Sequence, residues 1–221
     1  MKTLNKNDVD AVIFDLDGTL IDTEKIYRKI WPQAMKEIGY IYTDEQYLFM
    51  RSLGKPFALA QFKAWYGEDF DYDLAKRTRK VLFDNHIGKY GIEKKAGAIE
   101  LLTYLREHGI LTAIATATDY DRASQYIEMA GLTAYFDAVL SADMVDEGKP
   151  TPKIYNYACE TLGFAPDRCV AVEDSPNGIT SAYRAGCKVI MIPDQSPFDA
   201  SQSDMVFECV DRLDDICNII V

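Results

Sequence analysis

The chain has 221 residues, of which 48% are hydrophobic and 27% charged, and its net charge is −11. This composition is typical of a folded globular protein with one large domain, or with a core domain and a smaller companion. The negative charge argues against nucleic acid as a partner, because phosphate backbones attract basic surfaces. No apolar run approaches the ~20 residues of a membrane span, and the polar start lacks the apolar middle of a secretory signal.

Cysteine and histidine usage narrows the chemistry further. The five cysteines are odd in number and include no Cys-x-x-Cys pair, so we expect reduced thiols in a cytoplasmic protein. Zinc sites usually show close cysteine pairs, which are missing here. With only two histidines, a histidine-based triad or a histidine-rich metal site has little to draw on.

A buried strand is expected near the start of the chain. Residues 9–14 form a short apolar run rich in β-branched side chains, which predicts a strand ending at Asp15. The next stretch, about residues 22–90, spaces its apolar side chains as a helix does and contains no convincing strand. We therefore expect a helical insert after the first strand.

From about residue 96 onward, the pattern alternates between helix and strand. Helices are expected at 98–108, 120–130, 153–162 and 178–185, and strands at 110–115, 138–140, 169–172 and 188–192. A glycine follows the helices, where a C-cap favours a left-handed residue. The alternation predicts a parallel sheet covered by helices on both faces. Ligands of such sheets bind at the carboxyl ends of the strands, so the residues there are the candidates for chemistry.

Two acids directly follow the first predicted strand, in the segment Asp-Leu-Asp-Gly-Thr at residues 15–19. Residues two apart in an extended segment point to the same side, so Asp15 and Asp17 can face one site. Close carboxylates repel, so they need a bound cation or a shared proton. The alternatives are a solvated acidic loop or a helix cap formed by Asp17 or Thr19. An EF-hand calcium loop is excluded, because its sixth position would be Leu20 rather than glycine.

Two further strand or helix boundaries carry groups suited to phosphate. Thr116 follows the strand at 110–115, and its hydroxyl with nearby backbone N–H groups can hold a phosphoryl oxygen. Lys149 lies in Gly-Lys-Pro-Thr-Pro at 148–152, where the prolines stiffen the approach to a helix. The alternatives are a helix N-cap for Thr116 and a surface lysine for Lys149.

A second pair of acids follows the strand at 169–172. Glu173 and Asp174 offer hard oxygen ligands of the kind that Mg²⁺ prefers. The alternative is a helix N-terminus at which acids interact favourably with the helix dipole.

Together, these four signals resemble the haloacid dehalogenase (HAD) superfamily of phosphotransferases. Its motifs stand here in order as residues 15–19, Thr116, residues 148–152 and Glu-Asp-Ser-Pro-Asn-Gly at 173–178, over almost the whole chain. The helical insert resembles the cap of the subgroup that contains β-phosphoglucomutase and many small-metabolite phosphatases. The resemblance implies an α/β fold with a Rossmann-like parallel-sheet core, residues 1–20 and 92–221, and an inserted helical-bundle cap, residues 21–91.

The resemblance also implies roles for the core residues. Asp15 would attack phosphorus and form an aspartyl phosphate, while Asp17 would act as general acid and then as general base. Thr116 and Lys149 would hold the transferring phosphoryl group. The expected function is hydrolysis of a small phosphorylated metabolite, with no nucleic acid or membrane as partner.

Magnesium is the expected cofactor. The resemblance implies that Asp15 and Asp174 bind Mg²⁺ with Asp17, which usually contributes its backbone carbonyl. Glu173 would assist directly or through water. Three clustered acids with few compensating cations fit this expectation.

The cap is expected to choose the substrate. Arg51 and Lys55 are its candidate specificity residues, because Gly54 between them allows a turn that brings backbone near the site. The basic run Lys76, Arg77, Arg79 and Lys80 is expected to be mostly a solvated helix face, from which one member can reach the cleft.

Three other functions share this fold. A sugar-phosphate mutase would use the same nucleophile, but mutases of this subgroup carry a cap histidine, and Tyr27 lies about where it would be. A non-catalytic binding protein would have lost core motif residues, and none is lost. Haloacid dehalogenation is disfavoured, since those relatives lack the second aspartate of the first motif. The sequence leaves open the substrate and the choice between monomer and dimer.

Overall fold

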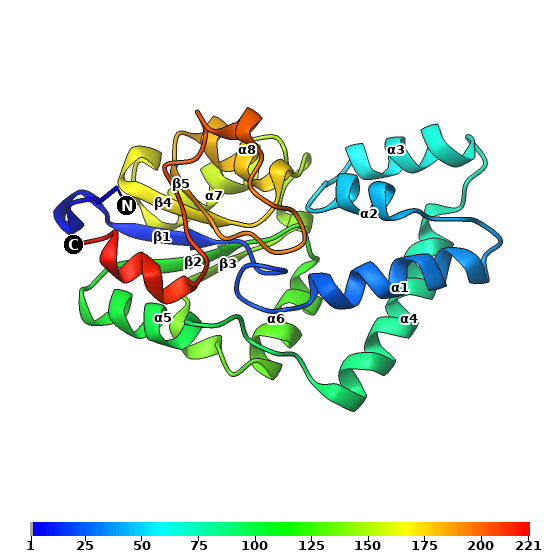
Figure 1. Ribbon diagram of the computed structural model, residues 1–221, viewed down its shortest axis with the longest axis horizontal. Coiled ribbons are helices and arrows are strands. Elements are labelled where there is room, and N and C mark those ends of the chain that lie inside the picture. Colours follow the sequence, from blue (N-terminus) through cyan, green and yellow to red (C-terminus); the bar gives the residue numbers. More distant parts are fainter. Residues whose placement is uncertain (1) are drawn as a thin grey trace.

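The computed structural model describes residues 2–221 and contains one six-stranded sheet flanked by helices (Figure 1). The strands are β1 (Ala11–Phe14), β2 (Leu111–Ala115), β3 (Ala138–Leu140), β4 (Cys169–Glu173), β5 (Lys188–Met191) and β6 (Glu208–Cys209). The helices are α1 (Glu24–Glu37), α2 (Asp44–Met50), α3 (Phe57–Tyr66), α4 (Tyr72–Tyr90), α5 (Ala98–Glu107), α6 (Tyr120–Met129), α7 (Lys153–Leu162) and α8 (Pro176–Ala185).

The sheet is parallel throughout, in the order β3-β2-β1-β4-β5-β6. Side chains of β1 alternate between two cores: Val12 and Phe14 pack with residues of α5 and α6, whereas Ala11 and Ile13 pack with residues of α7 and α8. Burial on both faces explains why the strands read as continuous apolar runs. The predicted α/β fold with a helix-covered parallel sheet is confirmed.

Most element boundaries agree with the sequence to within two residues, and the differences have local causes. The first strand begins at Ala11 rather than residue 9, because residues 6–8 form a short 3₁₀ turn. Helix α8 begins at Pro176, earlier than predicted, because the Ser175 hydroxyl caps it by accepting from the Gly178 N–H at 3.1 Å. Strand β6 was not predicted, since two residues are too short for a periodic signal.

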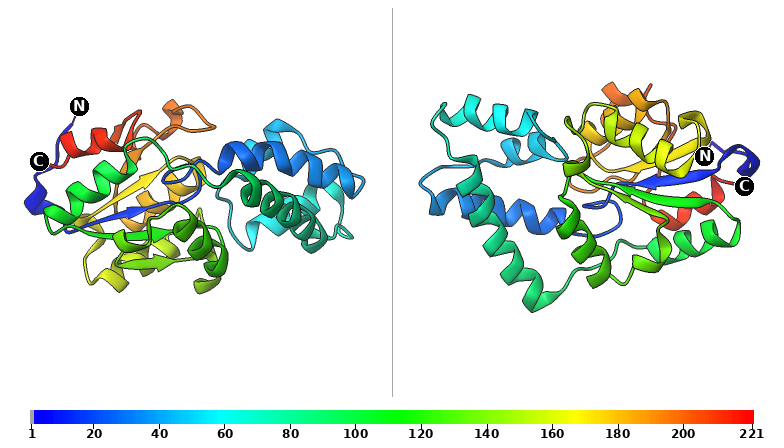
Figure 2. Two further views of the ribbon diagram at one scale, coloured as in Figure 1. Left: turned by 90° about the horizontal axis from the view of Figure 1, so that it is seen from below. Right: turned by 180° about the vertical axis from the view of Figure 1, so that it is seen from behind.

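Helices α1 to α4 form a separate group beyond the carboxyl ends of the strands (Figures 1 and 2). They pack around an aromatic cluster in which Phe62 lies 5.4 Å from Trp31, 5.7 Å from Tyr42 and 5.3 Å from Phe70 between ring centroids. Within residues 2–221, all named strands lie outside the segment that runs from α1 to α4. The division into a core and a cap at residues 20 and 92 remains a prediction.

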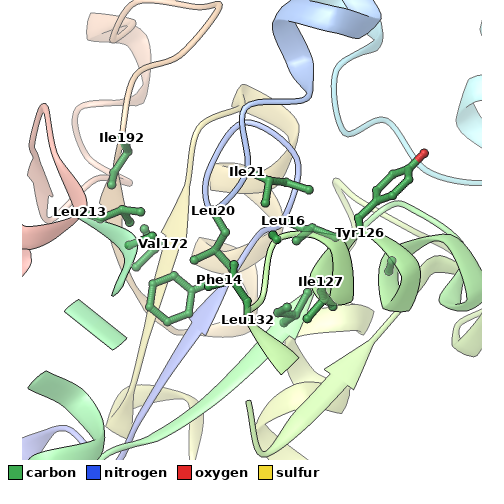
Figure 3. Packing of buried hydrophobic residues seen from close by; sticks show 14 of the residues in the cluster. Phe14, Leu16, Leu20, Ile21, Tyr126, Ile127, Leu132, Val172, Ile192 and Leu213 are labelled. Atoms are coloured by element: carbon green, nitrogen blue, oxygen red, sulfur yellow. The ribbon is translucent and has the colours of Figure 1, made fainter. Parts of the chain in front are cut away.

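The segment after β1 is anchored by apolar side chains. Leu16, Leu20 and Ile21 are fully buried and lie in the same cluster as Phe14 (Figure 3). Leu16 stands between Asp15 and Asp17, so its burial fixes the backbone that carries both acids. Packing beneath the site therefore fixes the backbone geometry where β1 ends.

Two Gly-Lys-Pro segments, residues 54–56 beside the cap helices and residues 148–150 in the core, contact each other. The Gly54 N–H donates to the Lys149 carbonyl at 2.9 Å, and the Gly148 N–H donates to the Lys55 carbonyl at 2.7 Å. A Cβ atom at Gly54 would lie 2.7 Å from the Gly148 Cα, and one at Gly148 would lie 2.8 Å from the Gly54 Cα. Only glycine at both positions allows this backbone contact, which we call the glycine contact.

No helix within residues 2–221 is both long enough and apolar enough to cross a bilayer.

We expect Gly148→Ala to weaken the glycine contact, because its methyl group would meet backbone rather than a movable side chain. Overpacking of this kind costs about 1–3 kcal/mol in the free energy of unfolding. Gly88→Ala is the control, since a Cβ there meets nothing within 4 Å and alanine favours the helix. Denaturant unfolding measures both variants. Equal stabilities for the two would show that the contact is not tight.

Candidate active site

A cavity of about 150 Å³ lies where the strand ends meet the cap helices. Of the eight predicted site residues, five line it: Asp15, Asp17, Thr116, Arg51 and Lys55. The other three, Lys149, Glu173 and Asp174, are fully buried behind Asp15. The structure thus brings all eight predicted site residues to one end of the sheet.

Lys149 forms a buried bridge between two acids. Its Nζ donates to the Asp15 Oδ1 at 2.6 Å and also to the Glu173 Oε1. Burial lowers the pKa of Lys149, but the charges of Asp15 and Glu173 raise it by more, so the ammonium stays charged. Lys149 is therefore not the surface lysine of the alternative interpretation.

Asp15 has one fixed oxygen and one without a partner. Its Oδ1 accepts from Lys149, whereas its buried Oδ2 has no hydrogen-bond partner. Burial raises the pKa of Asp15 well above its ordinary value, and Lys149 opposes that shift. Because an unpaired buried oxygen is costly, this atom points to a group that binds or reacts there.

Glu173 has its oxygens occupied by protein donors. They accept from Lys149, from the Tyr155 hydroxyl at 2.8 Å, from the Ser175 hydroxyl at 3.3 Å and from the Asp174 N–H at 3.2 Å. A Cβ atom at residue 178 would lie 2.0 Å from the Glu173 carboxylate, so only glycine at this position of α8 leaves space for that side chain. Glu173 therefore holds Lys149 in place.

Arg51 reaches from the cap loop to the acids behind the cavity. Its Nη2 pairs with the Asp174 Oδ2, its Nε lies 3.4 Å from the Glu24 Oε2, and its Nη1 donates to the Ser196 hydroxyl at 2.8 Å. Burial raises the pKa of Asp174 to about 8 and that of Glu24 to about 7, and Arg51 opposes both shifts. Arg51 is thus a charge partner for the acids as well as a lining residue.

Asp17 faces the cavity from a different direction. Its Oδ1 accepts from the Thr23 hydroxyl at 2.6 Å and its Oδ2 accepts from the Thr118 hydroxyl at 2.7 Å. Helix α1 begins at Glu24 with Thr23 in the N-cap position, so neither Asp17 nor Thr19 caps it. The helix-cap interpretation of the first motif is wrong.

Thr116 is buried at the end of β2, and its hydroxyl oxygen accepts from the Thr118 N–H at 3.1 Å. Helix α6 begins only at Tyr120, with Asp119 in the N-cap position, so Thr116 is not the N-cap of that helix. The Thr118 N–H is thus bonded to the Thr116 hydroxyl oxygen.

The acid cluster has the composition of a divalent-cation site. Carboxylate oxygens of Asp15, Glu173 and Asp174 lie within 4.8 Å of one another, and all three residues are buried. Lys149 and Arg51 supply two positive charges against these three acids and Glu24. Hard oxygen ligands and excess negative charge fit Mg²⁺. The Asp17 carboxylate lies outside this cluster, so only its backbone could join it.

Several cavity residues escaped the sequence analysis. Thr118 follows Thr116 by two positions, so the spacing argument applied to Asp15 and Asp17 could have identified it. Glu24 and Arg122 carry no local signal, because their partners Arg51 and Tyr27 lie far away in the sequence. In the basic run, Lys76 and Arg79 line the cavity.

Comparisons with known proteins find similar sequences and similar structures. The sequence model of the haloacid dehalogenase-like hydrolases matches residues 12–192. Hexitol phosphatase A of Escherichia coli is 31% identical over 204 residues, which cover 91% of this chain and 91% of that protein. The phosphorylated carbohydrates phosphatase of Thermotoga maritima is 30% identical over 185 residues, covering 82% and 84%. The crystal structure of CbbY from Rhodobacter sphaeroides in complex with phosphate superposes with a TM-score of 0.80 at 26% identity, covering 94% and 96%.

We expect Lys149→Met to destabilise the protein by about 3–5 kcal/mol, because it leaves Asp15 and Glu173 buried without their cation. Lys153→Met is the matched control. Lys153 pairs with Asp146 and Glu147 at the surface, where ion pairs contribute little. Urea unfolding of both variants tests the difference. If Lys149→Met were as stable as Lys153→Met, the buried bridge would not hold the site together.

Proposed function

Because the chain belongs to the haloacid dehalogenase-like hydrolases and is an enzyme of their phosphatase class, we propose that it hydrolyses a small phosphorylated sugar or polyol through an aspartyl phosphate on Asp15. One observation carries the proposal. Asp15 is held by Lys149 through one oxygen at 2.6 Å and keeps its other, buried oxygen without a partner at the wall of the cavity. A carboxylate in this position is oriented as a nucleophile.

In the first step, the Asp15 Oδ2 attacks phosphorus and the bond from phosphorus to the leaving oxygen breaks. Asp17 lines the same cavity and donates a proton to that oxygen, which leaves as an alcohol. The hydroxyls of Thr23 and Thr118 fix the Asp17 carboxylate for this transfer.

In the second step, water attacks the phosphorus of the aspartyl phosphate. Asp17, now ionised, accepts a proton from that water, and the bond between phosphorus and the Asp15 oxygen breaks. Phosphate leaves and both acids regain their starting states. Thr116 and Lys149 contribute position and charge on the phosphoryl side, which is the main requirement of phosphoryl transfer.

Asp15 and Asp174 would hold Mg²⁺ with the backbone carbonyl of Asp17. When bound, the ion would neutralise negative charge on the phosphoryl oxygens. Glu173 would lie outside the direct ligands of the ion, because its oxygens already accept four hydrogen bonds from Lys149 and neighbouring residues.

Hydrolysis is favoured over mutase chemistry by the residue at the cap wall. Tyr27 lines the cavity, and burial raises its pKa well above its ordinary value. Its phenol therefore stays protonated and cannot serve as a base that prepares a second sugar hydroxyl for attack. Neither His86 nor His108 is among the residues that line this cavity.

The cap helices are inferred to be a second domain that opens to admit substrate, with the glycine contact marking the closed state. Residues 1–20 and 92–221 would form the core and residues 21–91 the cap. A cytoplasmic location, inferred from cysteine usage, completes the proposal.

We expect purified protein to release phosphate from members of a phosphometabolite panel only when Mg²⁺ is present. Excess EDTA should abolish turnover and added Mg²⁺ should restore it. Asp174→Asn should need far more Mg²⁺ for the same rate, whereas the exposed control Asp167→Asn should behave like the parent. Activity that persists unchanged in EDTA would rule out the metal, and release from no panel member with Mg²⁺ would rule out the proposed activity.

A further inference from the structure

One part of the cavity wall carries positive charge that the protein's own acids do not neutralise. Besides Arg51, four basic side chains line the cavity: Lys55, Lys76 and Arg79 from the cap, and Arg122 from helix α6 of the core. Within residues 2–221, none of the four has a carboxylate oxygen within 4.0 Å.

Arg79 is held by aromatic rings instead of acids. Its guanidinium carbon lies 5.1 Å from the ring centroid of Tyr27 and 4.8 Å from that of Trp31. Its Nε is buried and has no hydrogen-bond partner. An aromatic ring face attracts the positive charge of the guanidinium but does not accept hydrogen bonds from its in-plane N–H groups. These N–H donors of Arg79 therefore remain available to bind an oxyanion.

Arg122 approaches the same tyrosine from its hydroxyl end. Its Nη2 donates to the Tyr27 hydroxyl at 3.0 Å and to the Tyr126 hydroxyl, while its buried Nε has no partner. Tyr27 is stacked on Phe83, with 4.2 Å between ring centroids. Two guanidinium groups are thus positioned around one fixed tyrosine.

This pair lies on the leaving-group side of the reaction. Asp17 lines the same cavity as Tyr27, Arg79 and Arg122. Burial raises the pKa of Tyr27 and the charge of Asp17 adds to that shift, whereas burial lowers the pKa of Arg122 and the charge of Asp17 is among the effects that raise it. Asp17 is also the residue that would protonate the leaving oxygen. The remainder of a bound substrate would therefore extend from Asp17 along the wall formed by Tyr27, Arg79 and Arg122.

We propose that the leaving group of the substrate carries a second oxyanion, a carboxylate or a further phosphate, that binds between Arg79 and Arg122. This inference rests on the proposed phosphatase function and narrows its substrate class. Arginine presents parallel N–H donors that match a carboxylate or phosphate in a bidentate manner. A net charge of −11 repels an anionic substrate at long range, and the positive charges of Arg79 and Arg122 offset that repulsion at the cavity.

Matched substrate pairs test the proposal. Terminally phosphorylated glycerate and gluconate carry a carboxylate where glycerol phosphate and sorbitol phosphate carry a hydroxymethyl group. Fructose bisphosphate and fructose monophosphate form the pair that tests a second phosphate. With Mg²⁺, we expect a higher kcat/KM for the acidic member of at least one pair, and the arm that responds identifies the oxyanion.

Arg79→Gln and Arg122→Gln should each reduce that preference by roughly 10–100-fold, the usual effect of losing a hydrogen bond to a charged group. Arg77→Gln is the control, because Arg77 is exposed on the same helix and does not line the cavity. Turnover of p-nitrophenyl phosphate, which has no second acid, should fall far less than turnover of the acidic substrate in Arg79→Gln and Arg122→Gln, and should stay near the parent level in Arg77→Gln. It also shows that each variant is folded.

The outcomes separate the two proposals. If the neutral members are hydrolysed as well as the acidic ones, or if both arginine variants keep the parent preference, the second oxyanion is refuted while the phosphatase function stands. If neither member of any pair, nor p-nitrophenyl phosphate, releases phosphate, the proposed function fails and the substrate class falls with it.

Discussion

The buried ammonium of Lys149, held between Asp15 and Glu173, is the interaction on which the rest of the site depends. Three acids meet behind the cavity because β1 and β4 are neighbours and both end there. Burial raises the pKa of Asp15, and Lys149 opposes that shift, which favours the ionised carboxylate that the proposed mechanism needs. Lys149 keeps Asp15 oriented, Glu173 with Tyr155 keeps Lys149 oriented, and Gly178 leaves the space that Glu173 needs.

The cations of the site divide into two groups by what surrounds them. Lys149 and Arg51 are compensated by buried acids, so they maintain the structure of the core site. Arg79 and Arg122 are surrounded by aromatic side chains and keep donors without partners. In the proposed mechanism, the first group organises the phosphoryl side of the cavity, and the second recognises the rest of the substrate. The glycine contact ties the two sides together, since it links the loop of Lys55 to the loop of Lys149.

The core could be predicted from the sequence because its chemistry follows a physical rule. Asp15, Thr116 and Asp174 each come at the end of an apolar run, and parallel strands deliver their carboxyl ends to one edge. The cap could not be predicted to the same depth, because its contacts join residues far apart in the chain. Arg51 meets Asp174 across 123 positions, and Arg122 meets Tyr27 across 95. Spacing within the basic run likewise gave no means of selecting Arg79 over Arg77.

Covalent transfer to Asp15 is the central claim, and rapid-quench analysis of Asp17→Asn with p-nitrophenyl phosphate tests it most directly. This leaving group needs little protonation, whereas hydrolysis of the intermediate still needs the base, so a phosphoryl group should accumulate on the protein. Peptide mapping should locate it on Asp15, and Asp15→Asn should give none. A burst of p-nitrophenolate without protein-bound phosphoryl, or a phosphoryl group on any other residue, would contradict Asp15 as the nucleophile.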